Sequence, residues 1–333
     1  MALDSKLLKR SLDRLGEKRQ LRTAEYESRR AELYRKDPEL KRIDSMLRTS
    51  VLELIEGAFG PNGGRFNASE IKAQNLELQA EYAERVRALG YPYDWLDYKP
   101  ECQICGDRGF VRGGMCSCLR KLYREEQIAE LAKTLKISEE TFDAFDLGYY
   151  SDLKRENGLS EREQMELIYE TCLRYARRFS RDTDNNLLLT GGTGLGKTFL
   201  STCIARVVSE AGFYAVYDTA VNIFGAFEGE KFSRSAEETE EYREMTERYI
   251  NCDLLIIDDL GTEMPSSFVT SAMYTLINSR LTEKRATIIS TNLSVEELRR
   301  RYSAQACSRI EGNYRILVFC GQDIRLQKKN ERK

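Results

Sequence analysis

Residues 191–198 of this chain read Gly191-Gly192-Thr193-Gly194-Leu195-Gly196-Lys197-Thr198. They fit the pattern G-x-x-x-x-G-K-[ST], in which a glycine-rich turn directs backbone N–H groups toward the phosphates of a nucleotide. The lysine adds a positive charge for those phosphates, and the threonine hydroxyl is a ligand for Mg²⁺. A helix that begins here turns its positive end toward the same anion. We therefore predict that residues 191–198 bind a nucleoside triphosphate.

The residues on either side agree with the strand–turn–helix unit that such a loop requires. Residues 186–190 form a short apolar run of strand length, and residues 198–210 carry apolar side chains at helical spacing before Gly212. Further apolar runs alternate with helical stretches downstream, at residues 215–218, 254–258, 286–291 and 315–319. This alternation predicts an α/β fold with a parallel sheet flanked by helices.

One of these apolar runs ends in two carboxylates, Leu254-Leu255-Ile256-Ile257-Asp258-Asp259. A buried strand followed by acidic residues is the Walker B arrangement of nucleotide-hydrolysing proteins. We expect Asp258 to hold the Mg²⁺ shell, directly or through water. Asp259 is expected to orient or activate the attacking water.

Three polar positions farther along extend the predicted site. Asn292 ends the run Ser290-Thr291-Asn292 and is predicted to contact the attacking water or the γ-phosphate, although such a pair also forms ordinary turns. Arg309 is the candidate arginine finger for the γ-phosphate of a neighbouring subunit, and a surface salt bridge is the alternative. Arg325 is a second candidate, for contact with the nucleotide of its own subunit.

Four of the nine cysteines are clustered, because only ten residues separate Cys102-x-x-Cys105 from Cys116-x-Cys118. Four thiolates can close a tetrahedral Zn²⁺ site, and the glycines between the pairs permit tight turns and a short hairpin. The chain contains no histidine, so every ligand would be a cysteine. A redox-active pair and an iron–sulfur cluster are the alternatives. The other five cysteines lie in apolar patterns and are expected to be buried.

Composition divides the chain into parts. Residues 1–98 read mainly as helix with a break at 59–64, and basic residues outnumber acidic ones at both ends of the chain. Residues 228–247 are acidic, which is typical of a solvated helix face or of a contact with a partner. There is no leader-like apolar run and no stretch long enough to span a bilayer, so we expect a soluble cytoplasmic protein with no membrane contact.

The order of the motifs resembles that of the AAA+ ATPases of the DnaC/DnaI helicase-loader group, to which the transposition ATPase IstB is related. The resemblance covers about residues 135–327 and includes Thr141-Phe142-Asp143-Ala144-Phe145, which is similar to a segment near the adenine pocket in that group. The cysteine cluster resembles the zinc-bearing region of DnaI-like proteins, which often differ in spacing or use a histidine. Residues 1–90 match no motif, and little chain follows Phe319 to form a full helical lid.

The resemblance implies ATP, Mg²⁺ and Zn²⁺ as cofactors, ATP hydrolysis used as a switch, and self-assembly through AAA+ interfaces with Arg309 acting in trans. It also implies binding of single-stranded DNA and of a DnaB-type replicative helicase. The corresponding division is a helicase-interacting helical region at 1–98, a zinc module at 99–120, a linker and adenine-proximal segment at 121–150, an ATPase domain at 151–327 and a basic tail at 328–333.

Two other functions are compatible with the motifs. The first is an IstB-like transposition ATPase acting on duplex DNA, and the second is a binding module with a degenerate ATP site. For contacts with single-stranded DNA, the best local candidates are aromatic and basic residues in the region after residue 220, with packing in the protein's own core as the alternative reading: Phe224, Phe227, Lys231, Phe232 and Arg234.

Overall fold

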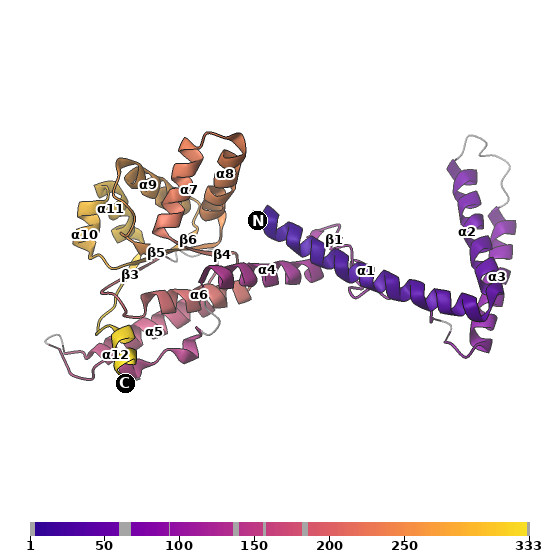
Figure 1. Ribbon diagram of the computed structural model, residues 1–333, viewed down its shortest axis with the longest axis horizontal. Helices are drawn as coiled ribbons and strands as arrows, with labels where there is room; N and C mark the ends of the chain where they lie inside the picture. The colour runs from indigo at the N-terminus through magenta and orange to yellow at the C-terminus, as the bar shows by residue number, and fades with distance from the viewer. Residues whose placement is uncertain are drawn as a thin grey trace. The chain divides into compact units, whose positions relative to one another are not determined.

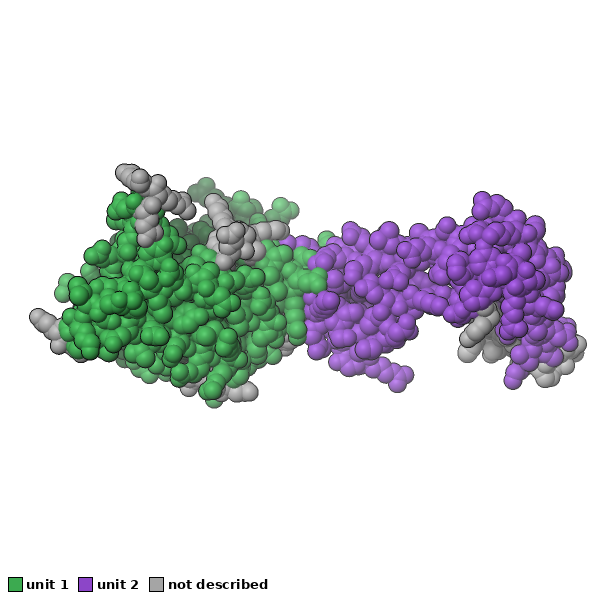
Figure 2. All heavy atoms as spheres, turned by 90° about the horizontal axis from the view of Figure 1, so that it is seen from below, with its two compact units in different colours: residues 1–9, 123–333 green, residues 10–122 purple. Residues whose placement is uncertain are grey.

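The computed structural model describes residues 4–59, 68–92, 94–135, 140–155, 158–181 and 186–331. The chain divides into two compact units, a larger one of residues 1–9 and 123–333 and a smaller one of residues 10–122 (Figure 2). The five-part division expected from the sequence stays a prediction. Within the described ranges, no helix combines the length and the apolar character needed to cross a membrane.

The larger unit is built on a five-stranded sheet whose strands all run parallel, in the order β4-β5-β6-β3-β7. The strands are β3 (Leu187–Thr190), β4 (Ala215–Thr219), β5 (Leu254–Leu260), β6 (Ala286–Thr291) and β7 (Arg315–Val318). The predicted α/β fold is thus confirmed. Because β6 lies between β3 and β5, the carboxyl ends of these three strands meet at one edge of the sheet.

Helices cover both faces of this sheet (Figure 1). One face packs against α5 (Glu161–Arg177) and α6 (Lys197–Glu210). The opposite face carries α7 (Ala220–Phe232), α8 (Ala236–Asn251) and α9 (Ser267–Thr282), and the chain ends with α10 (Val295–Arg301), α11 (Ala304–Asn313) and α12 (Ile324–Glu331). A sheet buried on both sides needs strands that are apolar at every position, which explains the unbroken apolar runs in the sequence.

The helix ends follow local sequence signals. Side-chain oxygens of Ser and Thr accept a hydrogen bond from a backbone N–H at the start of six helices, and two of these starts are complete capping boxes, at Ser160 with Glu163 and at Ser294 with Glu297. Two short 3₁₀ turns, Phe142–Ala144 and Leu147–Tyr149, precede α5.

The first described residues also belong to the larger unit. The backbone N–H of Asp4 donates to the Tyr123 hydroxyl at 2.9 Å, and its carboxylate accepts from the Tyr214 hydroxyl at 2.9 Å. Lys6 forms an ion pair with Glu244 of α8. These contacts anchor the start of α1 (Ser5–Lys36) on the larger unit.

The smaller unit is mostly helical, as the sequence predicted. It holds most of α1, α2 (Pro38–Phe59), α3 (Ala68–Ala88) and the first turn of α4 (Ser117–Leu135). A cluster of Leu33, Leu40 and Val86 is covered by aromatic side chains, among them the single tryptophan of the chain, Trp95. The break predicted at 59–64 lies, after Phe59, outside the described residues.

Candidate nucleotide site and candidate metal centre

The candidate phosphate-binding loop, residues 191–198, extends from the carboxyl end of β3 into the first turn of α6, as the pattern predicts. Gly191, Gly194 and Gly196 have φ angles of 140°, 74° and 89°, which residues with a Cβ rarely adopt. A Cβ at Gly191 would also lie 2.5 Å from the carbonyl oxygen of Phe319. Leu195 anchors the loop, because it is buried and its carbonyl accepts a hydrogen bond from Tyr150 at 3.0 Å. Gly192 and Thr193 are exposed at the tip.

The ammonium group of Lys197 is held inside the loop. Its Nζ lies 2.8 Å from the Gly191 carbonyl oxygen, 2.7 Å from that of Gly192 and 2.7 Å from Oδ1 of Asn292. Burial lowers the pKa of Lys197, while the charges of Asp259 and Asp258 oppose this shift. The structure thus brings Asn292, predicted only from its place after a strand, into contact with the lysine.

Asp258 and Thr198 face each other across the end of β5. The Thr198 hydroxyl lies 3.1 Å and 3.4 Å from the two carboxylate oxygens of Asp258. A hydroxyl and a carboxylate are the oxygen ligands that Mg²⁺ takes in nucleotide sites, so this donor set fits the ion that the pattern implies.

Sequence reasoning missed Tyr217, whose hydroxyl donates a hydrogen bond to Oδ2 of Asp258. Both side chains are buried, and burial together with the charge of Asp258 raises the pKa of Tyr217. The only signal in the sequence is a tyrosine within an apolar strand. The sequence does not show that β4 pairs with β5, which places Tyr217 opposite Ile256.

Asp259 has a backbone conformation that is unusual for a residue with a side chain. Its φ is 51°, and the pairing between β5 and β6 shifts register between Ile257 and Leu260. The carboxylate is half-buried; burial and the charge of Asp258 raise its pKa, whereas Lys197 and Arg325 lower it. Backbone strain of this kind often accompanies a functional site.

The two candidate arginines lie in different surroundings. Arg325, in the first turn of α12, is close enough for its charge to lower the pKa of both Lys197 and Asp259. Arg309, on α11, stacks on the Tyr274 ring at 5.3 Å and donates from Nη2 to the Tyr274 hydroxyl at 3.1 Å. No hydrogen bond or ion pair within the described ranges joins Arg309 to the loop at 191–198.

Aromatic side chains pack behind the phosphate-binding loop. The Phe145 ring lies 5.7 Å from Phe199 and 6.0 Å from Tyr150, and a Cβ at Gly196 would be 3.0 Å from it. Phe142 of the same segment is buried in the core. The segment Thr141–Phe145 therefore contacts the loop and the first turn of α6.

The candidates for DNA contact separate into two groups. Phe224 is buried in the larger unit, so the structure assigns it to the core. Phe232 is 59% exposed and packs on Phe268, and the Lys231 ammonium lies within 5.5 Å of both rings. Phe227 is half-buried, and Arg234 is exposed.

The second candidate site lies in the smaller unit, where the four clustered cysteines meet. Their Sγ atoms all lie within 4.8 Å of one another, with 3.7 Å between Cys102 and Cys116 and 3.4 Å between Cys105 and Cys118. A zinc ion with Zn–S bonds of about 2.3 Å requires tetrahedral edges of about 3.8 Å, so the four thiols fit such an ion.

The backbone around these cysteines supports the cluster. The hairpin of β1 (Phe110–Val111) and β2 (Gly114–Met115) separates the two pairs, as predicted. The buried Asp107 accepts hydrogen bonds from the N–H groups of Glu101 and Cys102 at 3.0 Å and 2.8 Å. A hydrogen bond from the N–H of Cys118 lowers the pKa of Cys116, whereas burial and the neighbouring thiols raise the pKa of Cys118. The remaining five cysteines are buried, as expected.

Comparison with known proteins adds relatives to this geometry. The replicative helicase loader DnaC of Escherichia coli (strain K12) is 25% identical over 152 residues, which are 44% of this chain and 60% of DnaC. An insertion sequence IS21-like putative ATP-binding protein of Bacteroides fragilis (strain YCH46) is 29% identical over 146 residues, 44% of this chain and 65% of that protein. The chain thus spans less than two thirds of the length of these relatives.

Two solved structures show similarity to about half of the chain. The DnaC helicase loader has a TM-score of 0.44 at 18% identity and covers 54% of this chain and 97% of its own. DnaI has a TM-score of 0.44 at 16% identity, with coverages of 57% and 94%. The model of the family described as IstB-like ATP binding protein matches residues 149–330, more than half of the chain. These residues contain the loop at 191–198 together with Asp258, Asp259 and Asn292, and the chain belongs to the IstB-like ATP-binding protein family.

Proposed function

We propose that this protein is an ATP-dependent loader that binds a DnaB-type replicative helicase and single-stranded DNA during the initiation of DNA replication. The observation that carries the ATP dependence is the convergence of Lys197, Asn292, Thr198 and Asp258 at one edge of the sheet. The similarity to proteins named as helicase loaders supports the choice of partner.

The geometry supports ATP hydrolysis as the reaction. The backbone N–H groups of 191–198 and the ammonium of Lys197 bind the phosphates, and Thr198 with Asp258 hold Mg²⁺, which supplies charge neutralisation at the phosphate oxygens. Asp259 accepts a proton from the attacking water or orients it. Asn292 contacts the same water or the γ-phosphate.

Arg309 supports a site that two subunits share. Its guanidinium is on α11 and has no described contact with its own phosphate-binding loop, whereas Arg325 acts on that loop from α12. In the assembled protein, Arg309 inserts beside the γ-phosphate of a neighbouring subunit, and hydrolysis serves as a switch. Residues 1–98 contact the helicase, Zn²⁺ binds the four clustered cysteines, and the protein works in the cytoplasm.

Two measurements test the proposal. The full-length protein, mixed with the replicative helicase of its host and with ATP, is expected to form a complex visible by native mass spectrometry. Absence of a complex at micromolar concentrations of both proteins would contradict the loader function. Lys197→Ala is expected to weaken ATP binding by roughly 10–100-fold, since it removes charge-assisted hydrogen bonds worth about 1.5–3 kcal/mol. Equal ATPase rates in the wild type and in Lys197→Ala would contradict the assignment of Lys197 to a catalytic site.

A second candidate is a transposition ATPase that acts on duplex DNA, which the similarity to the IS21-like ATP-binding protein favours. Fluorescence anisotropy with matched single-stranded and duplex oligonucleotides separates the two functions. Preference for the single strand supports the loader, and preference for the duplex supports the transposition ATPase. Lys231→Glu is expected to weaken binding to the single strand, with a smaller effect at high salt.

A further inference from the structure

We propose that Glu263 is a positioning residue, which holds the turn that carries Asp259 against the junction of α10 and α11. The inference rests on the proposed ATPase function. Glu263 is in the loop after β5 and is 5% exposed, although it is a carboxylate. A carboxylate is retained in such a place only where several hydrogen bonds offset its desolvation.

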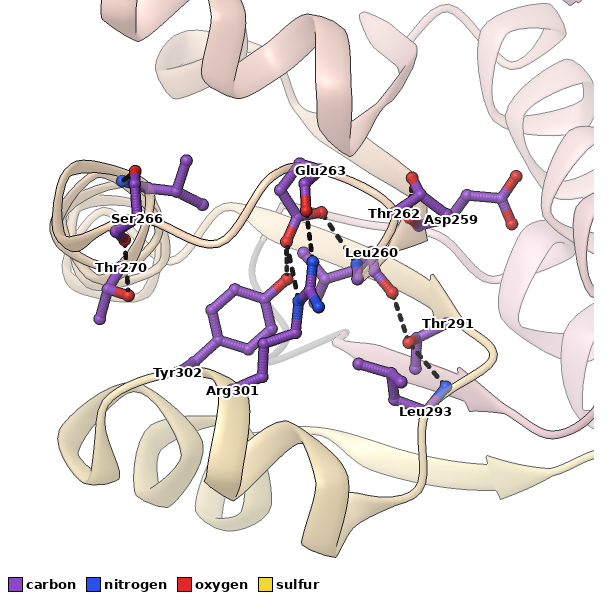
Figure 3. A network of polar contacts seen from close by, with 12 residues as sticks. Asp259, Leu260, Thr262, Glu263, Ser266, Thr270, Thr291, Leu293, Arg301 and Tyr302 are labelled. Carbon is purple, nitrogen blue, oxygen red and sulfur yellow. Dashed lines mark hydrogen bonds and ion pairs between the residues drawn. The ribbon is translucent and has the colours of Figure 1, made fainter.

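The two carboxylate oxygens of Glu263 join segments that are far apart in the sequence. Oε2 accepts a hydrogen bond from the N–H of Gly261 at 2.9 Å. Oε1 accepts from the Tyr302 hydroxyl and lies 3.4 Å from Nε of Arg301, whose Nη2 also donates to the Glu263 carbonyl. Figure 3 shows these side chains converging, whereas that of Asp259 points away from them.

On one side, these bonds hold a turn that has little freedom to relax. Asp259 and Gly261 both have positive φ angles, of 51° and 105°. The Asp259 carbonyl accepts from the backbone N–H and the hydroxyl of Thr262 at 3.2 Å and 2.8 Å. The Leu260 carbonyl accepts from the Thr291 hydroxyl at 2.6 Å, next to Asn292 (Figure 3). Glu263 adds to these bonds the one from the N–H of Gly261, two residues from Asp259, and thereby helps to set the direction of the Asp259 carboxylate.

On the other side, Glu263 contacts the junction of α10 and α11. Tyr302 is the C-cap residue of α10, and its neighbour Ser303 is the N-cap residue of α11, which carries Arg309. Burial and the hydrogen bond to Glu263 raise the pKa of Tyr302, so its hydroxyl stays a donor. The same carboxylate thus connects the residue that activates water with the helix that offers Arg309 to a neighbour.

Glu263→Gln keeps the size of the side chain but leaves one acceptor oxygen for donors that now use two. We expect kcat for ATP to fall about tenfold through misorientation of Asp259, while KM changes less than about twofold, because the phosphate-binding loop is untouched. Tyr302→Phe removes only the hydroxyl and should lower kcat with the same KM. Glu296→Gln, an exposed carboxylate on α10, is the matched control and should match the wild type.

A double-mutant cycle shows whether the two residues act through one contact. If they do, Glu263→Gln combined with Tyr302→Phe loses little more kcat than Glu263→Gln alone. The inference would be overturned if the kcat loss in the double variant equalled the product of the two single losses. It would also be overturned if Glu263→Gln unfolded at the wild-type temperature and either kept the wild-type kcat or showed a rise of KM as large as its fall in kcat. A wild-type protein with no ATPase activity would instead overturn the proposed function and the inference with it.

Discussion

Removal of metal from the cysteine cluster should release the segment of residues 101–118 in the smaller unit. No large apolar side chain of this segment is buried: Ile104 is 70% exposed, and Phe110 and Val111 are also exposed. The buried groups are instead Cys105, Asp107, Gly109 and Cys116. The segment has no core of its own, so its order depends on what the four thiols bind.

The expected magnitude follows from how far the free metal concentration exceeds Kd. Structural zinc sites contribute about 10–16 kcal/mol of apparent binding free energy at neutral pH. At a free metal concentration a thousandfold above Kd, binding stabilises the closed segment by about 4 kcal/mol. The population of the open segment should then rise roughly a thousandfold when the metal is removed.

Limited trypsin digestion measures this opening, because Arg108 and Arg112 lie inside the segment. We expect the metal-free protein to be cut there first, and readdition of Zn²⁺ to restore protection. Cys118→Ser should behave like the metal-free protein, whereas Cys172→Ala, which removes a buried thiol elsewhere, should keep its metal. Metal analysis and visible absorption identify the ion, since an iron–sulfur cluster is coloured. A protein that is purified without metal and resists trypsin at both arginines would refute this reasoning.

Three further predictions concern the larger unit. Gly191→Ala should destabilise it by about 3 kcal/mol, because the new Cβ adds positive-φ strain and a close contact with the Phe319 carbonyl. Gly225→Ala is the control, since it lies on a helix with open space around it and should stabilise the unit slightly. Urea unfolding compares the two variants. Arg280→Met should lower the free energy of unfolding by about 3–5 kcal/mol in the same assay. The reason is that the fully buried guanidinium donates hydrogen bonds to backbone carbonyls that would lose their donor. An unchanged free energy of unfolding would contradict this. Asp259→Asn should abolish hydrolysis but raise the free energy of unfolding at pH 7, because the raised pKa means that folding disfavours the ionised carboxylate. This gain should vanish as the pH falls below about 3.9, where the unfolded chain is protonated as well, and a gain that persists there would show another cause.

Local patterns were sufficient for the parts of the site that are continuous in the sequence. The loop at 191–198 and the pair Asp258–Asp259 are each a short continuous segment. Their residue types are sufficient to predict the local backbone geometry. The cysteine cluster is similar, since its spacing and its glycines permit a hairpin between two pairs. The strands were predicted within about two residues, because burial on both faces leaves unbroken apolar runs.

The particular contacts between distant segments could not be predicted in this way, although the order of the motifs assigned Asn292 to the candidate site. Asn292 meets Lys197 across 95 positions, and Tyr217 meets Asp258 across 41. Both contacts depend on the order of strands in the sheet, about which the composition of one strand says nothing. The same limit explains Phe224, whose aromatic ring fits a surface contact as well as a core until its helix is placed on the sheet.

The strand order also brings two sets of contacts together at the edge of the sheet. Tyr217 of β4 bonds to Asp258 of β5, and Asp258 contacts Thr198 at the start of α6. Asn292, after β6, bonds to Lys197 at the end of the loop that follows β3. Groups on or after β3, β4, β5 and β6 thus each contact another group of the site, and the burial of Tyr217, Asp258 and Lys197 leaves little room for independent adjustment. A change at Tyr217 therefore reaches Thr198 in two ways, through Asp258 and through the hydrogen bond between the Tyr217 and Thr198 side chains.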